Sequence, residues 1–163
     1  ASADSAGWPP FAMIVMIYFT LQCACSGSTS GGIKVERVLL LLKAVRAKIL
    51  KLKHPRAVVS LRLEGSFVND EVLTAGLLFI CCYLAVIFLS TVLLAACGVD
   101  LLSGFSASAA AMGNVGPGFG SVSSLSNYGA LPDAAKWVLT LVMLLGRLEI
   151  FGLLMFVSSR TLK

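Results

Sequence analysis

Charged residues are scarce in this chain, and their scarcity argues against a soluble protein. Asp, Glu, Lys and Arg make up 13% of the 163 residues, whereas hydrophobic residues make up 58%. The mean hydropathy is +0.92. A soluble domain carries about 25% charged residues, roughly twice this share. The composition therefore predicts an integral membrane protein.

Catalytic patterns are missing as well. The sequence has one histidine, His54, and it contains no GxSxG, HExxH, CxxC or Walker pattern. A loop histidine and scattered serines do not make a nucleophile–base pair. The five cysteines lack the spacing of a zinc or thioredoxin-type site and are interpreted as small hydrophobic residues. We therefore predict that the protein is not an enzyme and has no covalent cofactor. A membrane enzyme ranks third, well behind the two readings given below.

The positive charge that is present is concentrated. Nine of the 13 Lys and Arg lie between Lys34 and Arg62. No aromatic residues alternate with them as a single-strand stacking platform requires, so a nucleic-acid partner is not expected. The positive-inside rule places the part of this cluster from Lys43 to Arg62 on the cytoplasmic side. The first residues have no basic region of a secretory signal, and the start without methionine leads us to expect part of a longer chain.

One segment is long enough to cross a bilayer without ambiguity. Val72 to Cys97 is a run of 26 residues without a charge, and a spanning helix needs about 20. We predict a spanning helix over residues 72–98. A second apolar segment, 133–158, follows Pro132 and is predicted to be another.

Between these segments lies a shorter apolar run from Leu101 to Met112. Twelve helical residues rise about 18 Å, against about 30 Å of hydrocarbon. Glycine-rich residues 113–120 follow it. This order predicts a re-entrant loop with a pore helix at 101–112 and a filter at 113–118. An extracellular loop with a helical turn is the alternative. A dip that returns also keeps Arg160 and Lys163 in the cytoplasm.

The first part of the chain reads as one transmembrane helix interrupted midway. An apolar run from Phe11 to Gln22 is too short to span, residues 23–32 are small and polar, and an amphipathic pattern resumes at Ile33. Such broken helices place backbone carbonyls and hydroxyls near the middle of a membrane protein. A plain loop between two short helices is the alternative. His54-Pro55 ends the pattern, and residues 54–71 form a cytoplasmic connector, amphipathic or extended.

Two places in this arrangement have the chemistry to handle a cation. The C-terminal end of a pore helix carries partial negative charge, and the glycines after it permit a backbone that exposes successive carbonyls. Such carbonyls replace the hydration shell of potassium in potassium channels. Arg147, deep in the last apolar segment, needs a partner or water. It is either a buried tether or the residue that holds the interrupted loop across the path.

Three ordered motifs together carry a family resemblance. GSTSGGIK in the broken helix, GNVGPGFG after the short helix and LPDAAKWVLTLVMLLGRLEIF in the last segment resemble the Trk/Ktr/HKT potassium transporters, in particular their TrkH-like bacterial branch. The resemblance implies an all-α integral membrane fold of four helix–pore loop–helix repeats around one potassium-channel-like pore. Residues 1–53 would be the second helix of repeat three, and 72–163 would be repeat four.

The resemblance also implies roles for single residues. The carbonyls of Asn114, Val115, Gly116 and Pro117 would form one quarter of a K⁺ selectivity filter. The intramembrane gating loop would comprise eight residues, with Arg147 in contact with it: Cys25, Ser26, Gly27, Ser28, Thr29, Ser30, Gly31 and Gly32. Ala24 and Ser26 depart from the family pattern, where we expect a glycine and an alanine beside the loop cysteine.

The implied setting is a multi-pass protein of the bacterial cytoplasmic membrane that takes up K⁺, as a channel or as a symporter. The implied partners are membrane lipid, the remaining repeats of the same polypeptide, a second copy in a homodimer and a cytosolic nucleotide-binding regulatory subunit of the TrkA type. An alternative of another class is a non-transporting membrane scaffold that binds a cytosolic partner through the Lys34–Arg62 region.

Overall fold

Helices carry almost all of the described structure. The computed structural model describes residues 4–22, 31–53, 62–63, 66–67 and 70–148. The α-helices are α1 (Pro10–Leu21), α2 (Val35–Lys53), α3 (Asp70–Ala96), α4 (Leu101–Gly113) and α5 (Asp133–Arg147). Three short 3-10 helices are η1 (Ser5–Gly7), η2 (Gly120–Val122) and η3 (Tyr128–Ala130). This confirms the all-helical class, apart from two-residue strands β1 (Arg62–Leu63) and β2 (Ser66–Phe67), which pair antiparallel within the predicted connector.

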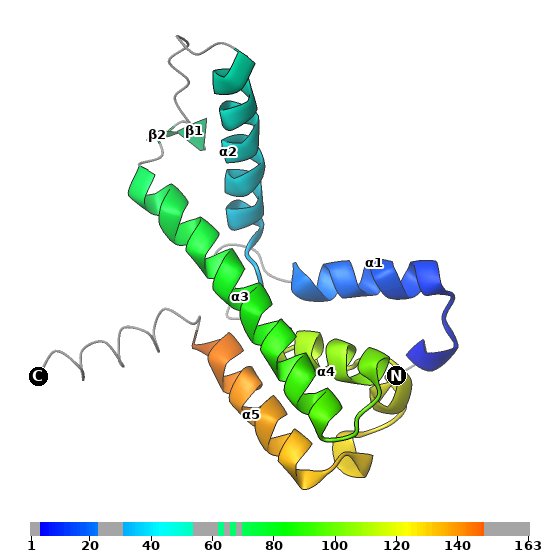
Figure 1. Cartoon of the computed structure of the whole chain (residues 1–163). Helices are drawn as coiled ribbons and strands as arrows, with labels where there is room; N and C mark the ends of the chain where they lie inside the picture. The colour runs from blue at the N-terminus through cyan, green and yellow to red at the C-terminus, as the bar shows by residue number, and fades with distance from the viewer. Residues whose placement is uncertain (1–3, 23–30, 54–61, 64–65, 68–69, 149–163) are drawn as a thin grey trace, which may run out of the picture.

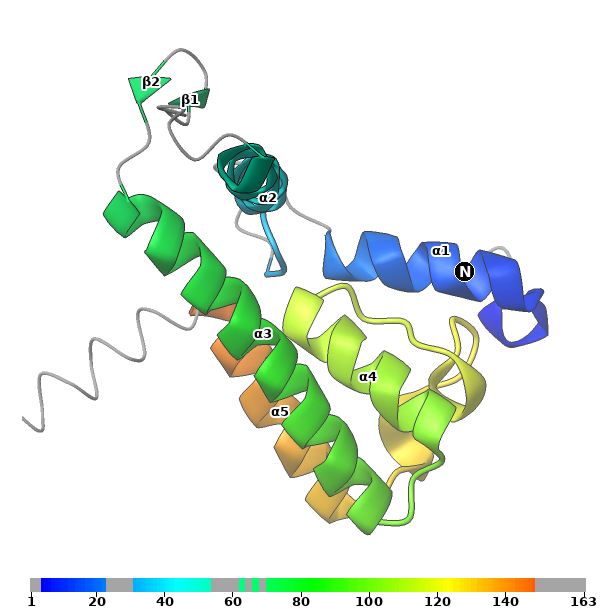
Figure 2. The ribbon, with the colours of Figure 1, turned by 45° about the horizontal axis from the view of Figure 1, so that its top comes forward.

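Helix α4 lies at the centre of the arrangement. Helices α3 and α5 run side by side, and α4 packs against both of them. Helix α1 lies over the other side of α4, while α2 packs on the first half of α3 (Figures 1 and 2). The short helix is therefore enclosed by elements from both ends of the chain.

Helix α3 is apolar all round but is buried along one stripe. Phe79, Tyr83 and Ile87 recur every four residues and are at most 3% exposed. On the other side Phe88 and Leu89 are 73% and 61% exposed. Within the described residues, the segment Leu73–Ala96 is the one helix both long and apolar enough to cross a membrane. Its exposed apolar face is what lipid or neighbouring helices cover in such a protein.

Helix α4 is buried for a different reason. Ten of its 13 residues are buried, from Ser103 to Gly113 with Phe105 excepted, and all but Met112 of these are serine, alanine or glycine. Small side chains let helix backbones approach closely. Its composition therefore fits it to the middle of a helical cluster rather than to a surface.

The first two helices are separate and point in different directions (Figure 1). Their ends are nevertheless tied together, because the Ile33 amide donates to the Leu21 carbonyl at 2.9 Å. Gly31 and Gly32 are buried at this junction, and Gly32 has a φ of 103°. That backbone region is open to glycine and costly for other residues. Most of the predicted loop, residues 23–30, lies outside the described residues.

Candidate functional site

The C-terminal end of α4 is shaped to stop the helix and turn the chain. Asn114 caps the helix in the left-handed conformation, with a φ of 55°. Its amide bonds to the Ala111 carbonyl at 3.1 Å, and the Val115 amide reaches the Ala110 carbonyl at 3.0 Å. Asparagine is one of the few residues other than glycine that adopt this conformation readily. The last turn of the helix is thereby closed, and its negative dipole end is directed at the residues that follow.

Residues 115–118 then run without regular secondary structure. The hydrogen bonds of the described residues leave the carbonyl oxygens of Asn114, Val115 and Pro117 without a donor. The Gly116 carbonyl differs, since it accepts a hydrogen bond from the Tyr128 hydroxyl. Gly116 has a φ of 106°, and a Cβ added there would meet no atom within 4 Å. Its need for glycine is therefore conformational rather than steric.

The next residues, 119–121, are hydrogen-bonded to serine hydroxyls of α4. Ser106 Oγ accepts from the Phe119 amide at 2.9 Å, and Ser103 Oγ accepts from the Ser121 amide at 3.1 Å. The Gly118 amide donates to the Val122 carbonyl at 2.8 Å. The Gly118 carbonyl accepts from Ser5 Oγ at 3.0 Å, so the start of the chain also holds this segment.

Three segments that are far apart in the sequence meet at the C-terminal end of α4. A Cβ added at Gly31 would lie 2.6 Å from the Met112 carbonyl oxygen and 3.2 Å from that of Gly146. A Cβ at Gly146 would collide with the Met112 carbonyl. The side-chain nitrogen of Asn114, Nδ2, is close to both glycines and donates to the Met143 carbonyl at 3.4 Å. The end of the broken-helix loop, the end of the short helix and the end of α5 are therefore in direct contact.

The predicted site residues divide into three groups. Residues 114–117 form one continuous turn and irregular segment, Gly31 lies close to the Asn114 side chain, and Gly32 is buried next to Gly31. Arg147 is the last residue of α5, with an exposed side chain, one position after the glycine that touches Met112. Cys25, Ser26, Gly27, Ser28, Thr29 and Ser30 lie outside the described residues.

Sequence reasoning missed three contributors: Tyr128, Ser5 and the pair of serines in α4. These two α4 serines had a detectable signal, because Ser103 and Ser106 are three apart and so share a helix face in a run of small and apolar residues. Tyr128 and Ser5 had none, since they reach the segment across 12 and 113 positions of sequence.

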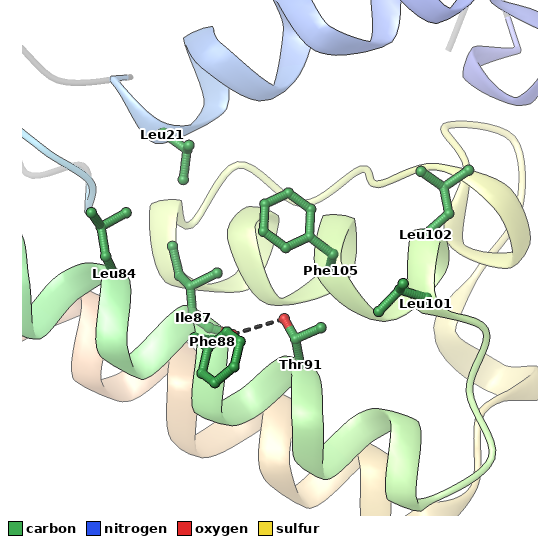
Figure 3. Close-up of a pocket in the computed structure, with 8 residues that line it drawn as sticks. All are labelled: Leu21, Leu84, Ile87, Phe88, Thr91, Leu101, Leu102 and Phe105. Atoms are coloured by element: carbon green, nitrogen blue, oxygen red, sulfur yellow. Dashed lines mark hydrogen bonds between the residues drawn. The ribbon is translucent and has the colours of Figure 1, made fainter.

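A separate cavity of about 670 Å³ lies between α1, α3 and α4 (Figure 3). It is lined by Leu21, Leu84, Ile87, Phe88, Thr91, Leu101, Leu102 and Phe105. The hydroxyl in this lining, that of Thr91, points back to the Ile87 carbonyl at 2.8 Å. The described residues that line this cavity therefore offer a cation no ligands. Among the described residues, no three His, Cys, Asp or Glu side chains gather into a metal site either.

The described residues define an all-helical protein in which α3 is long and apolar enough to cross a membrane and encloses, with its neighbours, the short helix α4. The chain belongs to the TrkH family of cation transport proteins, which it matches over residues 1–161. This is a family of transporters and not of enzymes.

Individual relatives agree with that assignment. The Trk system potassium uptake protein TrkH of Vibrio parahaemolyticus is 41% identical over 153 residues, which are 94% of this chain and 31% of that protein. TrkG of Escherichia coli, also a Trk system potassium uptake protein, is 35% identical over 98% of this chain and 32% of its own. The crystal structure of the Vibrio potassium transporter TrkH superposes with a TM-score of 0.82 at 42% identity, over 91% of this chain and 31% of that one. The chain thus spans about a third of the length of these relatives.

Proposed function

We propose that this chain forms part of a potassium-conducting pore in the bacterial cytoplasmic membrane, with residues 114–117 as one quarter of its selectivity filter. The observation that carries the proposal is the row of backbone oxygens after α4, because those of Asn114, Val115 and Pro117 accept no hydrogen bond from the described residues. Polar backbone at membrane depth must find a partner. A desolvated monovalent cation is a partner that satisfies several carbonyls at once.

The electrostatics of α4 favour the same occupant. Its N-terminal end is capped by Asp100, whose carboxylate accepts from the Leu102 amide at 3.2 Å. Its C-terminal end, with fully buried Met112, is directed at residues 114–117. A helix C-terminus acts as about half a negative charge, and enclosure by protein weakens the screening of that charge. A cation beside this turn is therefore stabilised without any acidic side chain.

Control of the path is proposed to lie beneath the filter. Gly31 packs against the Met112 carbonyl and the Gly146 carbonyl, so the end of the loop touches the base of the filter. We place the gate in residues 25–32, with Arg147 as the charge that holds it. In the same transport assay as below, Arg147→Ala is expected to raise K⁺ flux at equal expression, and unchanged or lower flux would remove the gate from the proposal.

The partners proposed follow from what the chain leaves uncovered. Its relatives are about three times longer, and one quarter of a filter needs three more to close a pore. We propose that further repeats of the same polypeptide, a second copy in a homodimer and a cytosolic nucleotide-binding subunit complete the assembly. The exposed cations Lys43, Arg46, Lys48 and Lys53 of α2 supply a basic surface on the predicted cytoplasmic side for that subunit.

The experiment replaces the filter glycine in the full-length transporter that carries this sequence, reconstituted in liposomes. Gly116→Ser is expected to lower the ratio of K⁺ to Na⁺ uptake, because a side chain disfavours the φ of 106° that aims the filter backbone. Gly98→Ser is the matched control, since Gly98 also has a positive φ, 83°, and open space, but ends α3. An unchanged ratio for Gly116→Ser contradicts the proposal. Binding of a cytosolic partner with no flux at all would favour a scaffold instead.

A further inference from the structure

The Gly116 carbonyl is the one oxygen of the four proposed filter carbonyls that the described residues hold in place. Its donor is the hydroxyl of Tyr128, which stands 12 positions later in the loop before α5. Neighbouring Asn114, Val115 and Pro117 have no such donor among the described residues. The four carbonyl oxygens are therefore not equivalent, because the described residues supply a hydrogen-bond donor to that of Gly116.

Tyr128 is well placed to act as a fixed support. It begins η3, where the Asn127 side chain caps the turn by accepting from the Gly129 amide at 3.0 Å. The Leu131 amide bonds back to the Tyr128 carbonyl at 3.2 Å, and Leu131 itself is buried in the core. The Tyr128 ring packs against that same core. Its hydroxyl therefore reaches Gly116 from a backbone held on both sides.

The hydroxyl is also in the right protonation state. A tyrosine with the ordinary pKa of 10.0 is already neutral and a donor at physiological pH, and burial raises the pKa of Tyr128 further. A carbonyl oxygen has two lone pairs. A hydrogen bond from Tyr128 occupies one and leaves the other for a cation. The bond thus orients this oxygen without removing it from the filter.

We propose that Tyr128 is a positioning residue for ion selectivity, whose hydroxyl stops the Gly116 carbonyl from closing onto a cation smaller than K⁺. The inference rests on the proposed function, in which Gly116 is part of the filter. Gly116 has no side chain and a Cβ there would touch nothing, so packing around its Cα does not restrain the peptide. The Tyr128 hydroxyl supplies that restraint. Without it, the freed oxygen follows the smaller ion inward and discrimination against Na⁺ falls.

The test is Tyr128→Phe in the full-length transporter in liposomes, which removes the hydroxyl and keeps the ring. The ratio of K⁺ to Na⁺ uptake is expected to fall about threefold to tenfold, the size expected from one hydrogen bond. Tyr18→Phe on α1 is the matched control, because the Tyr18 ring is 55% exposed, and its ratio should not change. Replacing Tyr128 with 4-aminophenylalanine, which keeps a donor at the same position, is expected to restore the ratio.

Coupling to the filter separates positioning from general stability. In a Gly116→Ser background, Tyr128→Phe is expected to change the ratio little further, because both changes act through one carbonyl. Two results for Tyr128→Phe would overturn the inference: equal losses of K⁺ and Na⁺ uptake, or an unchanged ratio with normal uptake. If Gly116→Ser still alters the ratio, the proposed function stands and only the inference fails. An unchanged ratio in Gly116→Ser would overturn the proposed function and the inference with it.

Discussion

Helices α3 and α4 are both strongly apolar, yet α3 exposes much of its apolar surface and α4 is mostly buried. Helix α3 keeps large side chains such as Phe88 and Leu89 on its exposed side, whereas α4 buries ten of 13 mostly small residues. Large exposed apolar residues suit contact with lipid or another helix, while small ones suit close approach of backbones. The comparison shows that apolar character alone does not define a membrane span. Side-chain size separates the helix that faces outward from the helix that is enclosed.

The hydroxyls of the two helices differ in the same way. Ser90 and Thr91 of α3 donate to the Ile87 carbonyl of their own helix at 3.0 and 2.8 Å. Ser103 and Ser106 of α4 accept from amides outside their helix, those of residues 121 and 119, while Ser106 Oγ also donates to the Ser103 carbonyl at 3.2 Å. The two hydroxyls of α3 therefore bond within their own helix. Those of α4 carry the fold of the returning segment.

The largest expected effect comes from adding a side chain where α4 meets α5. Gly146→Val forces side-chain carbons into the Met112 carbonyl, a backbone atom that cannot move aside, and should cost about 3 kcal/mol of stability. Its counterpart on α3 is Gly76→Ala, where the new Cβ would lie 3.3 Å from the flexible end of Leu40. That change should stay within about 1 kcal/mol, since alanine also favours the helix. Thermal unfolding in detergent measures the stability of both variants. Equal losses of stability in Gly146→Val and Gly76→Ala would contradict the difference in packing between α4 and α3.

A smaller effect is expected from the serines. Ser106→Ala leaves the buried Phe119 amide without its acceptor and should cost about 1–3 kcal/mol. Ser90→Ala removes a hydroxyl of similar burial, but the Ile87 carbonyl keeps its helical partner, so the loss should stay within about 0.5 kcal/mol. Denaturation of purified protein gives both values. If Ser90→Ala lowered the free energy of unfolding and Ser106→Ala left it unchanged, α4 would not hold residues 119–121 through its serines.

The smallest expected effect is on pH dependence. Burial raises the pKa of Tyr128 above 10.0, so the folded state holds its proton more tightly than the unfolded state does. The stabilisation this gives is fully present below pH 10.0 and is lost as the pH rises through and above that value. Thermal stability measured between about pH 9 and 11 should therefore fall more steeply for the natural protein than for Tyr128→Phe. Identical slopes would mean that Tyr128 is not held neutral by the fold.

Much of the architecture was predictable because it depends on local composition. The uncharged run from Val72 to Cys97 corresponds to α3, which begins two residues earlier at Asp70 and ends one residue earlier at Ala96. The short apolar run from Leu101 to Met112 is α4, which includes one more residue, Gly113. The predicted last helix, 133–158, corresponds to α5 as far as Arg147, and residues 149–163 lie outside the described part. Helix α1 ends at Leu21, just before the small residues that were predicted to interrupt the pattern.

The sequence by itself determined the membrane class, the positions of the apolar helices and the glycines that free the backbone after α4, because charge scarcity, run length and glycine content act within a few residues. Only the tertiary structure decided that Gly31, Met112 and Gly146 meet, and that Tyr128 and Ser5 hold the segment after α4. Those contacts join residues between 12 and 113 positions apart. Nothing in a local pattern specifies them, since they arise from how closely small residues let separate helices pack.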